Sequence, residues 1–380
     1  MRLNGRDKFL NQSWNPEGDF TIIMNVNENF FNGKRIFLTG HTGFKGAWLA
    51  FILYSFGAEV TGYSLESPTS PNLFTLIDLN KKINSVIGDI RDKENLQKVF
   101  NKCKPEIVFH LAAQPIVMEG YKNPLETYSI NVMGTVNILE CIRQSESVRS
   151  FVNVTTDKVY HNNEWCYGYR ETDILDGIDP YSNSKSCSEL VTACYQRSFF
   201  DGEDSTAIST ARAGNVIGGG DFAEFRIIPD CVRAALENKV IEVRNPNSVR
   251  PYQHVLEPLF AYMMIAETQY KDRKFAGSYN VGPDENDCMA TGELVNIFCE
   301  VYGQGISWKS LSADLPYESN FLKLDCSKIK SVFDWTPRWN IKTAVEKTVE
   351  WTKAYQNRDN LIKCMEQQIK NFLGSAINER

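Results

Sequence analysis

The sequence predicts an α/β protein in which a Rossmann-type, doubly wound parallel sheet carries a smaller, mixed α/β lobe. Short apolar segments alternate with helix-like segments from Arg35 to about Ala213. Strands separated by helices are typical of βαβ units and therefore of a parallel sheet. The glycines Gly40, Gly43 and Gly46 directly follow the first apolar segment and open the first helix-like one. A glycine-rich turn in that place is typical of doubly wound sheets.

The elements of the sheet follow from apolar runs of strand length separated by stretches of helical length. Right-handed crossovers between successive parallel strands place the helices on both faces of the sheet. Strands are predicted in RIFLTG from Arg35, in Glu59–Ser64 and in the segments INSVIGD, EIVFHLAA, SFVNVTTD and TAISTARA, and helices near Gly43–Phe56, Lys93–Asn101, Pro124–Gln144 and Tyr181–Ser198.

The alternation becomes irregular beyond Ala213. Gly218–Gly220 predict a flexible break, and prolines punctuate the short elements that follow. The expected organisation is an N-terminal extension over residues 1–29 that can be disordered, a Rossmann domain over 30–213, a mainly substrate-binding lobe over 214–365 with part of the chain returning to the core sheet near 241–281, and a C-terminal tail over 366–380.

Composition excludes several classes of protein. The chain has 380 residues, of which 42% are hydrophobic and 23% charged, so it can bury a large core. Its 41 basic and 47 acidic residues give a net charge of −6, which argues against nucleic acid as a main partner. Ten scattered cysteines include no C-x-x-C pair, so the sequence predicts no metal site.

The N-terminal residues and the length of the apolar runs indicate the cellular compartment of the protein. Residues 1–24 are polar and lack the apolar region of a secretory signal. The longest apolar run, Ala47–Tyr54, is far shorter than the roughly 20 residues that a membrane span needs. We therefore expect a reduced cytoplasmic protein without a membrane partner.

The segment TGHTGFKG predicts a binding site for the diphosphate of a dinucleotide. Gly40 allows a tight turn, Gly43 lets the backbone approach an anion, and Gly46 allows the helix to pack closely on the strand. The alternative is an ordinary strand–helix turn. We assign to the cofactor the loop and the following strand ends: Gly40, Thr42, Gly43, Phe44, Gly46, Tyr63, Asp89, Ile90, Leu111, Ala112 and Ala113, together with Tyr181 and Lys185.

The end of the second strand favours NAD over NADP. Its sequence, TGYSLESP, offers no Arg or Lys for a 2′-phosphate. Glu66 is the nearest acid, and it can equally be a solvated loop charge. Asp89, after the third strand, can face the adenine, whereas Asp92 suits the N-cap of the next helix.

Tyr181 and Lys185 in DPYSNSKS are the strongest catalytic candidates. They stand four residues apart, so on a helix both side chains share a face. An ammonium near a phenol lowers the pKa of the phenol from its ordinary value of about 10. A phenolate beside a nicotinamide can remove a hydroxyl proton. The alternative is a structural pair of the kind that is common on helices.

Several motifs together resemble a known superfamily. They are TGHTGFKG, LAAQP, NVMGT, TTDK, GYRE, DPYSNSK, RAGNVIGGGD, IIPD, RNPxxxRPxQHVLEP and LKLDCSK. They look like the extended short-chain dehydrogenase/reductase superfamily, and within it most like the CDP-glucose 4,6-dehydratases, from about Phe30 to Trp351. The resemblance implies tightly held NAD and a redox-neutral reaction: hydride leaves sugar C4, water is eliminated across C5 and C6, and the hydride returns to C6.

The resemblance also implies residue roles. Tyr181 would be the base for the C4 hydroxyl, Lys185 would tune it and bind the nicotinamide ribose, and Thr156 would hydrogen-bond the C4 oxygen. Asp157 matches the acid that protonates the departing C6 hydroxyl. Lys158 stands where related dTDP-sugar enzymes carry Glu as the C5 base. It would be either that base, with a lowered pKa, or a stabiliser of the enolate. The alternative for Asp157 and Lys158 is a surface ion pair.

A nucleotide sugar with two phosphates requires local cations in this acidic chain. Arg226, Arg244 and Arg250 lie in loops expected on the substrate side, and arginine can bind phosphate through two hydrogen bonds. The resemblance places Asn215 and Arg250 at the diphosphate, with Arg226 as a third contact. The alternative is that these are solvated loop arginines.

Several other residues do not point to one definite role. His254 fits a neutral hydrogen-bonding residue, and Glu171 can position a sugar hydroxyl or pair with Arg170. Met118, Gly120 and Tyr317 depart from the Arg, Ser and His that the resembled enzymes usually carry, so the identity of the sugar and base stays open.

Three alternative functions and an assembly state follow from the same residues. A nucleotide-sugar 4-epimerase, or a 4,6-dehydratase of another nucleotide sugar, would share the loop, Tyr181 and Lys185. An epimerase needs no acid for a C6 hydroxyl, so Asp157 and Lys158 argue against it. A non-catalytic NAD-binding sensor or scaffold would be expected to have lost Tyr181 or Lys185. The resemblance implies a homodimer or homotetramer, formed through helices such as Tyr181–Ser198, whose apolar face can otherwise be core.

Overall fold

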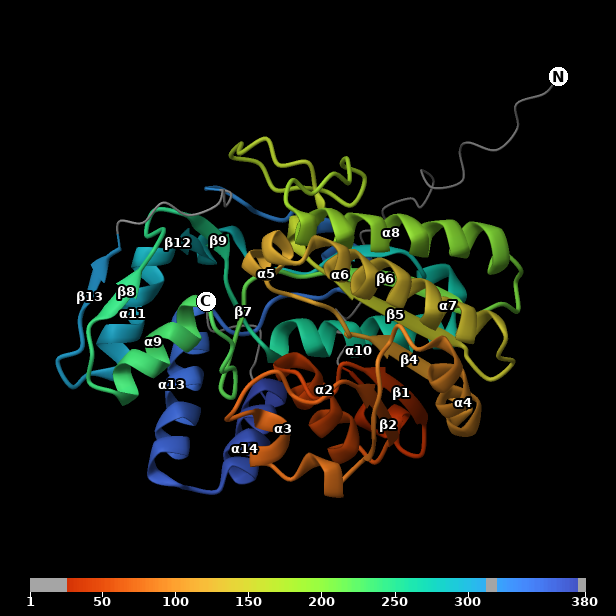
Figure 1. Ribbon diagram of the computed structural model, residues 1–380, viewed down its shortest axis with the longest axis horizontal. Helices are drawn as coiled ribbons and strands as arrows, with labels where there is room; N and C mark the ends of the chain where they lie inside the picture. The colour runs from red at the N-terminus through yellow and green to blue at the C-terminus, as the bar shows by residue number, and fades with distance from the viewer. Residues whose placement is uncertain (1–25, 312–319, 375–380) are drawn as a thin grey trace, which may run out of the picture.

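Seven parallel strands form the central sheet, in the order β11-β6-β5-β4-β1-β2-β3 (Figure 1). The computed structural model describes residues 26–311 and 320–374. The order reverses between β1 and β4, and ligands of doubly wound sheets bind at the carboxyl ends of the strands at such a point. The strands are β1 Arg35–Thr39, β2 Glu59–Ser64, β3 Asn84–Ile87, β4 Ile107–His110, β5 Ser150–Thr155, β6 Ala207–Arg212 and β11 Ser278–Asn280.

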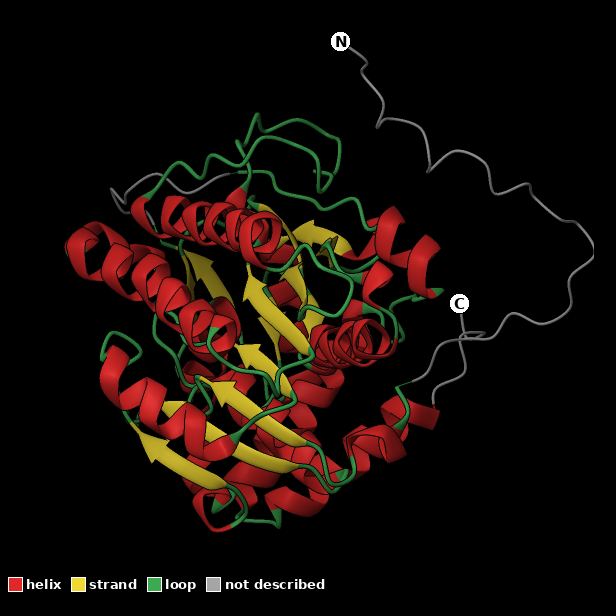
Figure 2. Ribbon diagram, turned by 90° about the vertical axis from the view of Figure 1, so that its right-hand side faces the viewer, coloured by secondary structure: helices red, strands yellow, loops and turns green. Residues whose placement is uncertain are grey.

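Helices cover both faces of this sheet, as Figure 2 shows. Alternate side chains of a strand point to opposite faces. Ile36 and Leu38 of β1 therefore belong to one core with α2 (Phe44–Ser55) and α10 (Leu256–Lys271). Phe37 belongs to a second core with α4 (Lys93–Cys103) and α7 (Gly134–Arg143). The predicted doubly wound parallel sheet is confirmed.

The smaller lobe has a hydrophobic core of its own, which includes Ile241, Leu294 and Val345. Within the described residues the chain then returns to the large sheet through α10 and β11. The elements of the lobe are β8 Ile241–Val243 paired with β13 Trp308–Ser310, β9 Val249–Pro251 paired with β12 Cys288–Ala290, β7 Val216–Ile217 paired with β10 Gln253–His254, and the helices α9 Ile227–Leu236, α11 Thr291–Tyr302 and α13 Ile341–Asn357.

The remaining helices are short or differ from the expectation. The predicted helix Pro124–Gln144 contains a π-helical turn over Ser129–Met133, in which the buried Asn131 donates to Gln114 O and Ser184 Oγ. Such turns often redirect a side chain toward a specific partner. The other helices are α1 Glu28–Phe31, α3 Leu73–Leu76, α5 Val117–Lys122, α6 Pro124–Tyr128, α8 Pro180–Phe199, α12 Ser327–Phe333 and α14 Leu361–Gly374.

Gly218–Gly220 form a packed junction, so the prediction of a flexible break is wrong. The indole Nε1 of Trp48, on α2, donates to Gly219 O at 2.9 Å. A Cβ atom on Gly219 would lie 2.0 Å from Cγ of Trp351, on α13. Glycine is needed here because an indole ring occupies the space of a side chain.

The C-terminal segment packs against the core, which corrects the expectation of a tail from residue 366. Helix α14 continues to Gly374, and its side chains at helical spacing, Met365, Ile369 and Phe372, are buried. Phe372 stacks on Phe260 with ring centroids 5.0 Å apart. No helix in the described part of the chain is long and apolar enough to cross a membrane.

Replacing Phe372 tests whether α14 belongs to the core. Phe372→Ala should lower the free energy of unfolding by about 3–5 kcal/mol, because it leaves a cavity beside two aromatic rings. The measurement is urea unfolding followed by circular dichroism. Lys370→Ala, an exposed change on the same helix, should alter stability by less than about 0.5 kcal/mol. Equal stability of the two variants would show that α14 does not stabilise the fold.

Candidate active site

The glycine loop between β1 and α2 is a tight cradle with one open side. Gly40 has φ +81°, and a Cβ there would lie 2.7 Å from Ala112 N. A Cβ on Gly46 would lie 2.0 Å from Gly40 O. The N-cap residue Gly43 would meet nothing closer than Gly40 O at 3.5 Å. The two tight contacts fix the turn, and the open side at Gly43 leaves backbone that an anion can approach.

Other residues that we assign to the cofactor make contacts within the protein. Thr42 Oγ1 donates to Leu65 O at 2.8 Å, and the fully buried Tyr63 donates its hydroxyl to Asp89 O at 3.1 Å. The Arg91 guanidinium binds the Asp89 carboxylate at 2.6 Å and lowers the pKa of that carboxyl. Asp92 caps α4, as predicted, by accepting from Asn95 N.

The end of β4 is held by a buried hydroxyl–imidazole chain. The backbone amides of Leu111 and Ala112 both donate to Thr39 Oγ1 at 3.1 Å. Thr39 also contacts Nδ1 of His110 at 2.7 Å, and Nε2 of His110 lies 3.3 Å from Thr135 Oγ1. Ala113 follows, partly buried, and Ile90 is buried against Gly134. Their contact with a cofactor stays a prediction.

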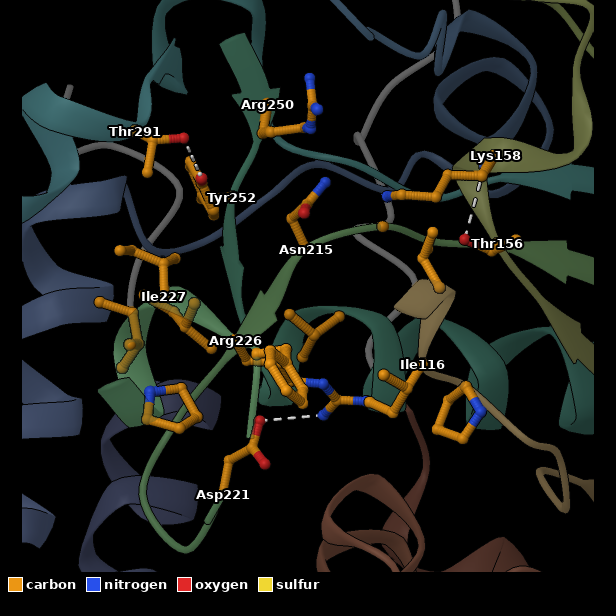
Figure 3. Close-up of a pocket in the computed structure, with 18 of the residues that line it drawn as sticks. Ile116, Thr156, Lys158, Asn215, Asp221, Arg226, Ile227, Arg250, Tyr252 and Thr291 are labelled. Atoms are coloured by element: carbon orange, nitrogen blue, oxygen red, sulfur yellow. Dashed lines mark hydrogen bonds and ion pairs between the residues drawn. The ribbon is translucent and has the colours of Figure 1, made fainter. Parts of the chain in front are cut away.

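A cavity of about 280 Å³ opens beside these strand ends, between the sheet and the smaller lobe (Figure 3). Figure 3 shows Lys158 reaching from its loop toward Asn215, while Arg226 lies below, against Ile116. The predicted residues that line the cavity are Phe44, Thr156, Lys158, Tyr181, Asn215, Arg226, Arg244 and Arg250, with Met118 beside them.

Helix α8 presents Tyr181 to the cavity and is anchored from behind by Glu189. The buried Glu189 carboxylate accepts hydrogen bonds from Thr155 Oγ1, from Thr210 Oγ1 at 2.7 Å and from the Arg212 guanidinium at 2.8 Å. Thr155 ends β5, and Thr210 and Arg212 belong to β6. One side chain thus ties the helix to two strands.

Tyr181 and Lys185 lie on the same helix, but their charge coupling differs from the expectation. Burial raises the pKa of Tyr181 to about 12, although a hydrogen bond with Thr156 opposes the shift. Burial lowers the pKa of Lys185 to about 8, and its ammonium donates to Val154 O at 3.0 Å. The prediction that the ammonium lowers the tyrosine pKa is therefore wrong here, because desolvation of the phenolate outweighs nearby positive charge.

Asp157 lies at the centre of a buried hydrogen-bond network. Its side chain is 0% exposed, and Oδ1 accepts from Thr156 Oγ1 at 2.9 Å and from the Lys158 ammonium at 3.4 Å. Oδ2 accepts from the Asn215 amide at 3.1 Å. A Cβ on Gly214 would lie 1.9 Å from that oxygen. A surface ion pair is excluded by the burial of Asp157.

Asn215 thus binds Asp157, whereas the resemblance places it at a substrate diphosphate. Its backbone is left-handed, with φ +42°, a conformation that asparagine tolerates better than most residues. The turn directs its amide between Asp157 and the cavity.

The three arginines reach the cavity from separate elements, each with an intramolecular partner. Arg226, at the N-cap of α9, binds Asp221 at 2.9 Å. Arg244 lies 3.5 Å from Asp230 and stacks over the ring of Phe225. Arg250, on β9, is only 2% exposed and donates to Val249 O at 3.0 Å. Burial contradicts the alternative of a solvated arginine at Arg250.

Two other predicted residues have mainly structural contacts. His254 is fully buried between Trp48 and Trp339, and burial lowers the pKa of its imidazole to about 3, so it is neutral as predicted. The Glu171 carboxylate accepts from Asn280 N at 2.8 Å, and Arg170 lies beside Asp325 instead. Tyr317 lies outside the described residues. No group of three His, Cys, Asp or Glu side chains that could hold a metal occurs in residues 26–311 and 320–374.

Sequence reasoning missed many of the residues that line the cavity, among them Lys45, Ser248, Tyr252 and Thr291. The hydroxyls of Ser248 and Tyr252 both lie 2.9 Å from Thr291 Oγ1, and no motif marks this cluster in advance. Lys45 lines the cavity from the first turn of α2. The signal for Lys45 was present, since it is the one charged residue of the glycine loop TGHTGFKG.

Comparisons with known proteins agree with this architecture. The sequence profile described as GDP-mannose 4,6 dehydratase matches residues 37–348. The CDP-glucose 4,6-dehydratase of Salmonella typhimurium is 44% identical over 92% of this chain and 99% of its own. The CDP-paratose 2-epimerase of Salmonella typhi is 27% identical over 84% of this chain and 99% of its own.

Solved structures share the fold at lower identity. The UDP-glucose 4-epimerase of Thermotoga maritima, solved with UDP-glucose, has a TM-score of 0.73 at 22% identity and covers 84% of this chain and 99% of its own. The dTDP-glucose 4,6-dehydratase of Bacillus anthracis, solved with NAD, has a TM-score of 0.69 at 22% identity and covers 87% and 99%.

The buried histidines predict how stability depends on pH. Burial lowers the pKa of His41 to about 4 and those of His110 and His254 to about 3. Below the ordinary histidine pKa of about 6.5, the unfolded chain binds protons that the folded chain does not, so the free energy of unfolding falls as the pH is lowered. Each group contributes about 1.4 kcal/mol per pH unit.

Urea unfolding at pH 7.5, 6.0 and 5.0 measures this dependence. His254→Gln should lose stability less steeply below pH 6.5 than the unmodified chain, by about 1.4 kcal/mol per pH unit. Identical slopes would mean that His254 is protonated in the folded state.

Proposed function

The chain belongs to the GDP-mannose 4,6-dehydratase family, and from this premise we propose that it is a hydro-lyase that converts CDP-glucose to CDP-4-keto-6-deoxyglucose with NAD as its cofactor. The near full-length similarity to CDP-glucose 4,6-dehydratase supports this substrate. The observation that carries the reaction type is the buried Asp157, held by Thr156, Lys158 and Asn215 next to Tyr181. A dehydration requires an acid at this point.

The glycine loop fits a dinucleotide diphosphate, because the open side at Gly43 exposes backbone amides at the N-terminus of α2. NAD, when bound there, supplies a reversible two-electron oxidation of the sugar. Gly40, Gly43, Phe44 and Gly46 would hold the diphosphate, and Lys185 the nicotinamide ribose. The strand ends at Asp89 and Leu111–Ala113 would hold the rest of the cofactor.

Tyr181 accepts the proton of the sugar C4 hydroxyl. Its phenol lies beside Thr156, whose hydroxyl can bind the same sugar oxygen. Because burial raises the pKa of Tyr181 to about 12, the ligand-free site holds the neutral phenol. Positive charge brought close to the phenol would lower that pKa toward neutrality.

Asp157 and Lys158 serve the elimination. Asp157 stands where the resembled enzymes carry the acid that protonates the departing C6 hydroxyl. The ammonium of Lys158, 19% exposed at the cavity wall, can stabilise the enolate while another base takes the proton from C5. Acting instead as the C5 base would require Lys158 in its neutral form.

The smaller lobe binds the nucleotide. Arg226, Arg244 and Arg250 converge on the cavity from three elements and can bind a diphosphate. Met118 lines the same cavity, and Gly120 packs beneath the catalytic helix, where a Cβ would lie 3.0 Å from Tyr181 N. These two positions are where we expect this chain to differ from its relatives in sugar preference.

The ten free cysteines fit a reducing compartment, and we propose that the enzyme acts in the cytoplasm. Its product would supply the synthesis of deoxysugars for a bacterial surface polysaccharide such as the lipopolysaccharide O-antigen. A 4-epimerase or another nucleotide-sugar dehydratase is the second candidate function, favoured by the fold shared with the UDP-glucose 4-epimerase and by the pair Tyr181 and Lys185, which the resemblance implies for both kinds of enzyme.

We also propose a homodimer or homotetramer assembled through α8 and its neighbours. Large apolar side chains are exposed on these adjacent helices: Leu125 at 86%, Met133 at 51% and Leu190 at 53%. Exposed apolar surface of this kind is typical of interaction sites.

Mass spectrometry of CDP-glucose after incubation with the enzyme tests the reaction. We expect the loss of one water with no net change in NAD, because the oxidation at C4 is reversed at C6. Tyr181→Phe and Asp157→Asn should each reduce turnover by about 100-fold or more and still bind NAD. An unchanged mass with inverted C4 would identify an epimerase, and full activity of Tyr181→Phe would contradict the mechanism.

Light scattering after size exclusion tests the assembly. The enzyme should elute with the mass of two or four chains, and Leu190→Glu should shift it toward a single chain. Lys363→Glu, on α14, is the control that should leave the mass unchanged. A single-chain mass for the unmodified enzyme at micromolar concentration would exclude the proposed interface.

A further inference from the structure

Lys45 occupies an unusual place for a lysine. It lies in the first turn of α2, two residues after Gly43, and its side chain lines the cavity that also holds Tyr181, Thr156 and Arg226. The residue is partly buried, and its ammonium lies over the ring of Tyr262, 6.0 Å from the centroid. Lys45 thus links the glycine loop to the cavity.

The surroundings of Lys45 leave its charge poorly compensated. Burial, Arg226 and Lys185 together lower the pKa of Lys45 to about 7, against the weaker opposing effect of Asp157 and Asp221. Both carboxylates already bind other groups, since Asp157 accepts from Thr156, Lys158 and Asn215, and Asp221 binds Arg226 at 2.9 Å. In residues 26–311 and 320–374, no hydrogen bond or salt bridge joins the Lys45 ammonium to another side chain.

An ammonium in such a place costs stability unless a ligand compensates it. Arg226 and Lys185 lie close enough to the Lys45 ammonium to disfavour its positive charge. An anion bound among them removes that repulsion. Two residues away, Gly43 offers open backbone at a helix N-terminus, which favours the same kind of ligand.

We propose that the Lys45 ammonium binds the diphosphate of the dinucleotide cofactor from the cavity side, opposite the backbone amides of the glycine loop, and so retains the cofactor through the reaction. This role rests on the proposed use of NAD. A nucleotide sugar also carries a diphosphate, and it is the competing source of the same chemistry. The position of Lys45 on the glycine loop favours the cofactor, whereas Arg244 and Arg250 lie on the smaller lobe.

Calorimetric titrations of the full chain, freed of bound nucleotide, test the proposal with NAD and, separately, with CDP. Lys45→Met should weaken NAD binding by about 10- to 100-fold, the worth of one charge-assisted hydrogen bond, and leave CDP binding within about twofold. Lys45→Arg should restore most of the NAD affinity because it keeps the charge. Lys363→Met removes an exposed lysine of α14 and should bind both ligands like the unmodified chain.

The pH dependence of NAD binding is a second readout. A bound diphosphate raises the pKa of Lys45, so the unmodified chain should take up a proton on binding and lose affinity as the pH rises from 6 to 9. Lys185, Arg226, Asp157, Asp221 and Tyr262 face the same ammonium, and Lys185 contributes its own dependence. Both Lys45→Met and Lys45→Arg should therefore show a slope smaller by about one proton.

The outcomes separate this inference from the function on which it rests. Normal NAD affinity in Lys45→Met, or a loss of CDP affinity in place of NAD affinity, would overturn the role of Lys45 and leave the dehydratase proposal intact. Failure of the unmodified chain to bind NAD would overturn both. If Lys45→Met does not fold, an unchanged pH slope in Lys45→Arg would still overturn the inference.

Discussion

The attachment of α8 to the sheet through Glu189 is the interaction on which the site depends. Glu189 binds Thr155, Thr210 and Arg212, and all four side chains are buried. Loss of one partner of a buried ion pair typically costs about 3–5 kcal/mol, because it leaves a charge uncompensated. The network fixes the rotation of α8 against β5 and β6. Tyr181 and Lys185 stand two turns and one turn before Glu189, so the same contacts fix where they meet Thr156 and Val154.

The acidic chain accommodates anionic ligands through local placement of charge. Arg226 and Arg244 each lie beside an aspartate, Asp221 and Asp230, which keeps them oriented without neutralising the cavity as a whole. Asp157 is similarly enclosed by donors from its own turn and from the loop after β6. The net charge of −6 is therefore compatible with two diphosphate ligands, because coupling at short range in a buried site outweighs the distant surface charge.

Local sequence patterns predict much of this structure. The rest depends on long-range packing, which those patterns do not show. The strand Glu59–Ser64 and the helix expected near Tyr181–Ser198, which spans Pro180–Phe199, could be predicted because apolar periodicity is a local signal. The same holds for the glycine loop and for the pair Tyr181 and Lys185. The prediction that Gly219 is flexible is wrong because only the fold brings Trp351 against it.

Two features of the site depend on the environment of a residue more than on its identity. The direction of the Tyr181 pKa follows from burial, which a sequence does not state. The link between Asn215 and Asp157 joins residues far apart in the chain. Lys45 stands in a recognisable motif, yet only the fold shows that it lines the same cavity as Tyr181 and Arg226.

The packed junction at Gly219 has an optical consequence. Trp48, on the Rossmann side, and Trp351, on the smaller lobe, meet across this glycine, and Trp339 lies nearby against His254. Three of the seven indoles of the chain are thus shielded from water at the seam between its two parts. Any hinge motion that parts the lobes would admit water to these indoles and shift their emission to longer wavelength. The intrinsic tryptophan fluorescence of the protein would therefore report a separation of the two lobes.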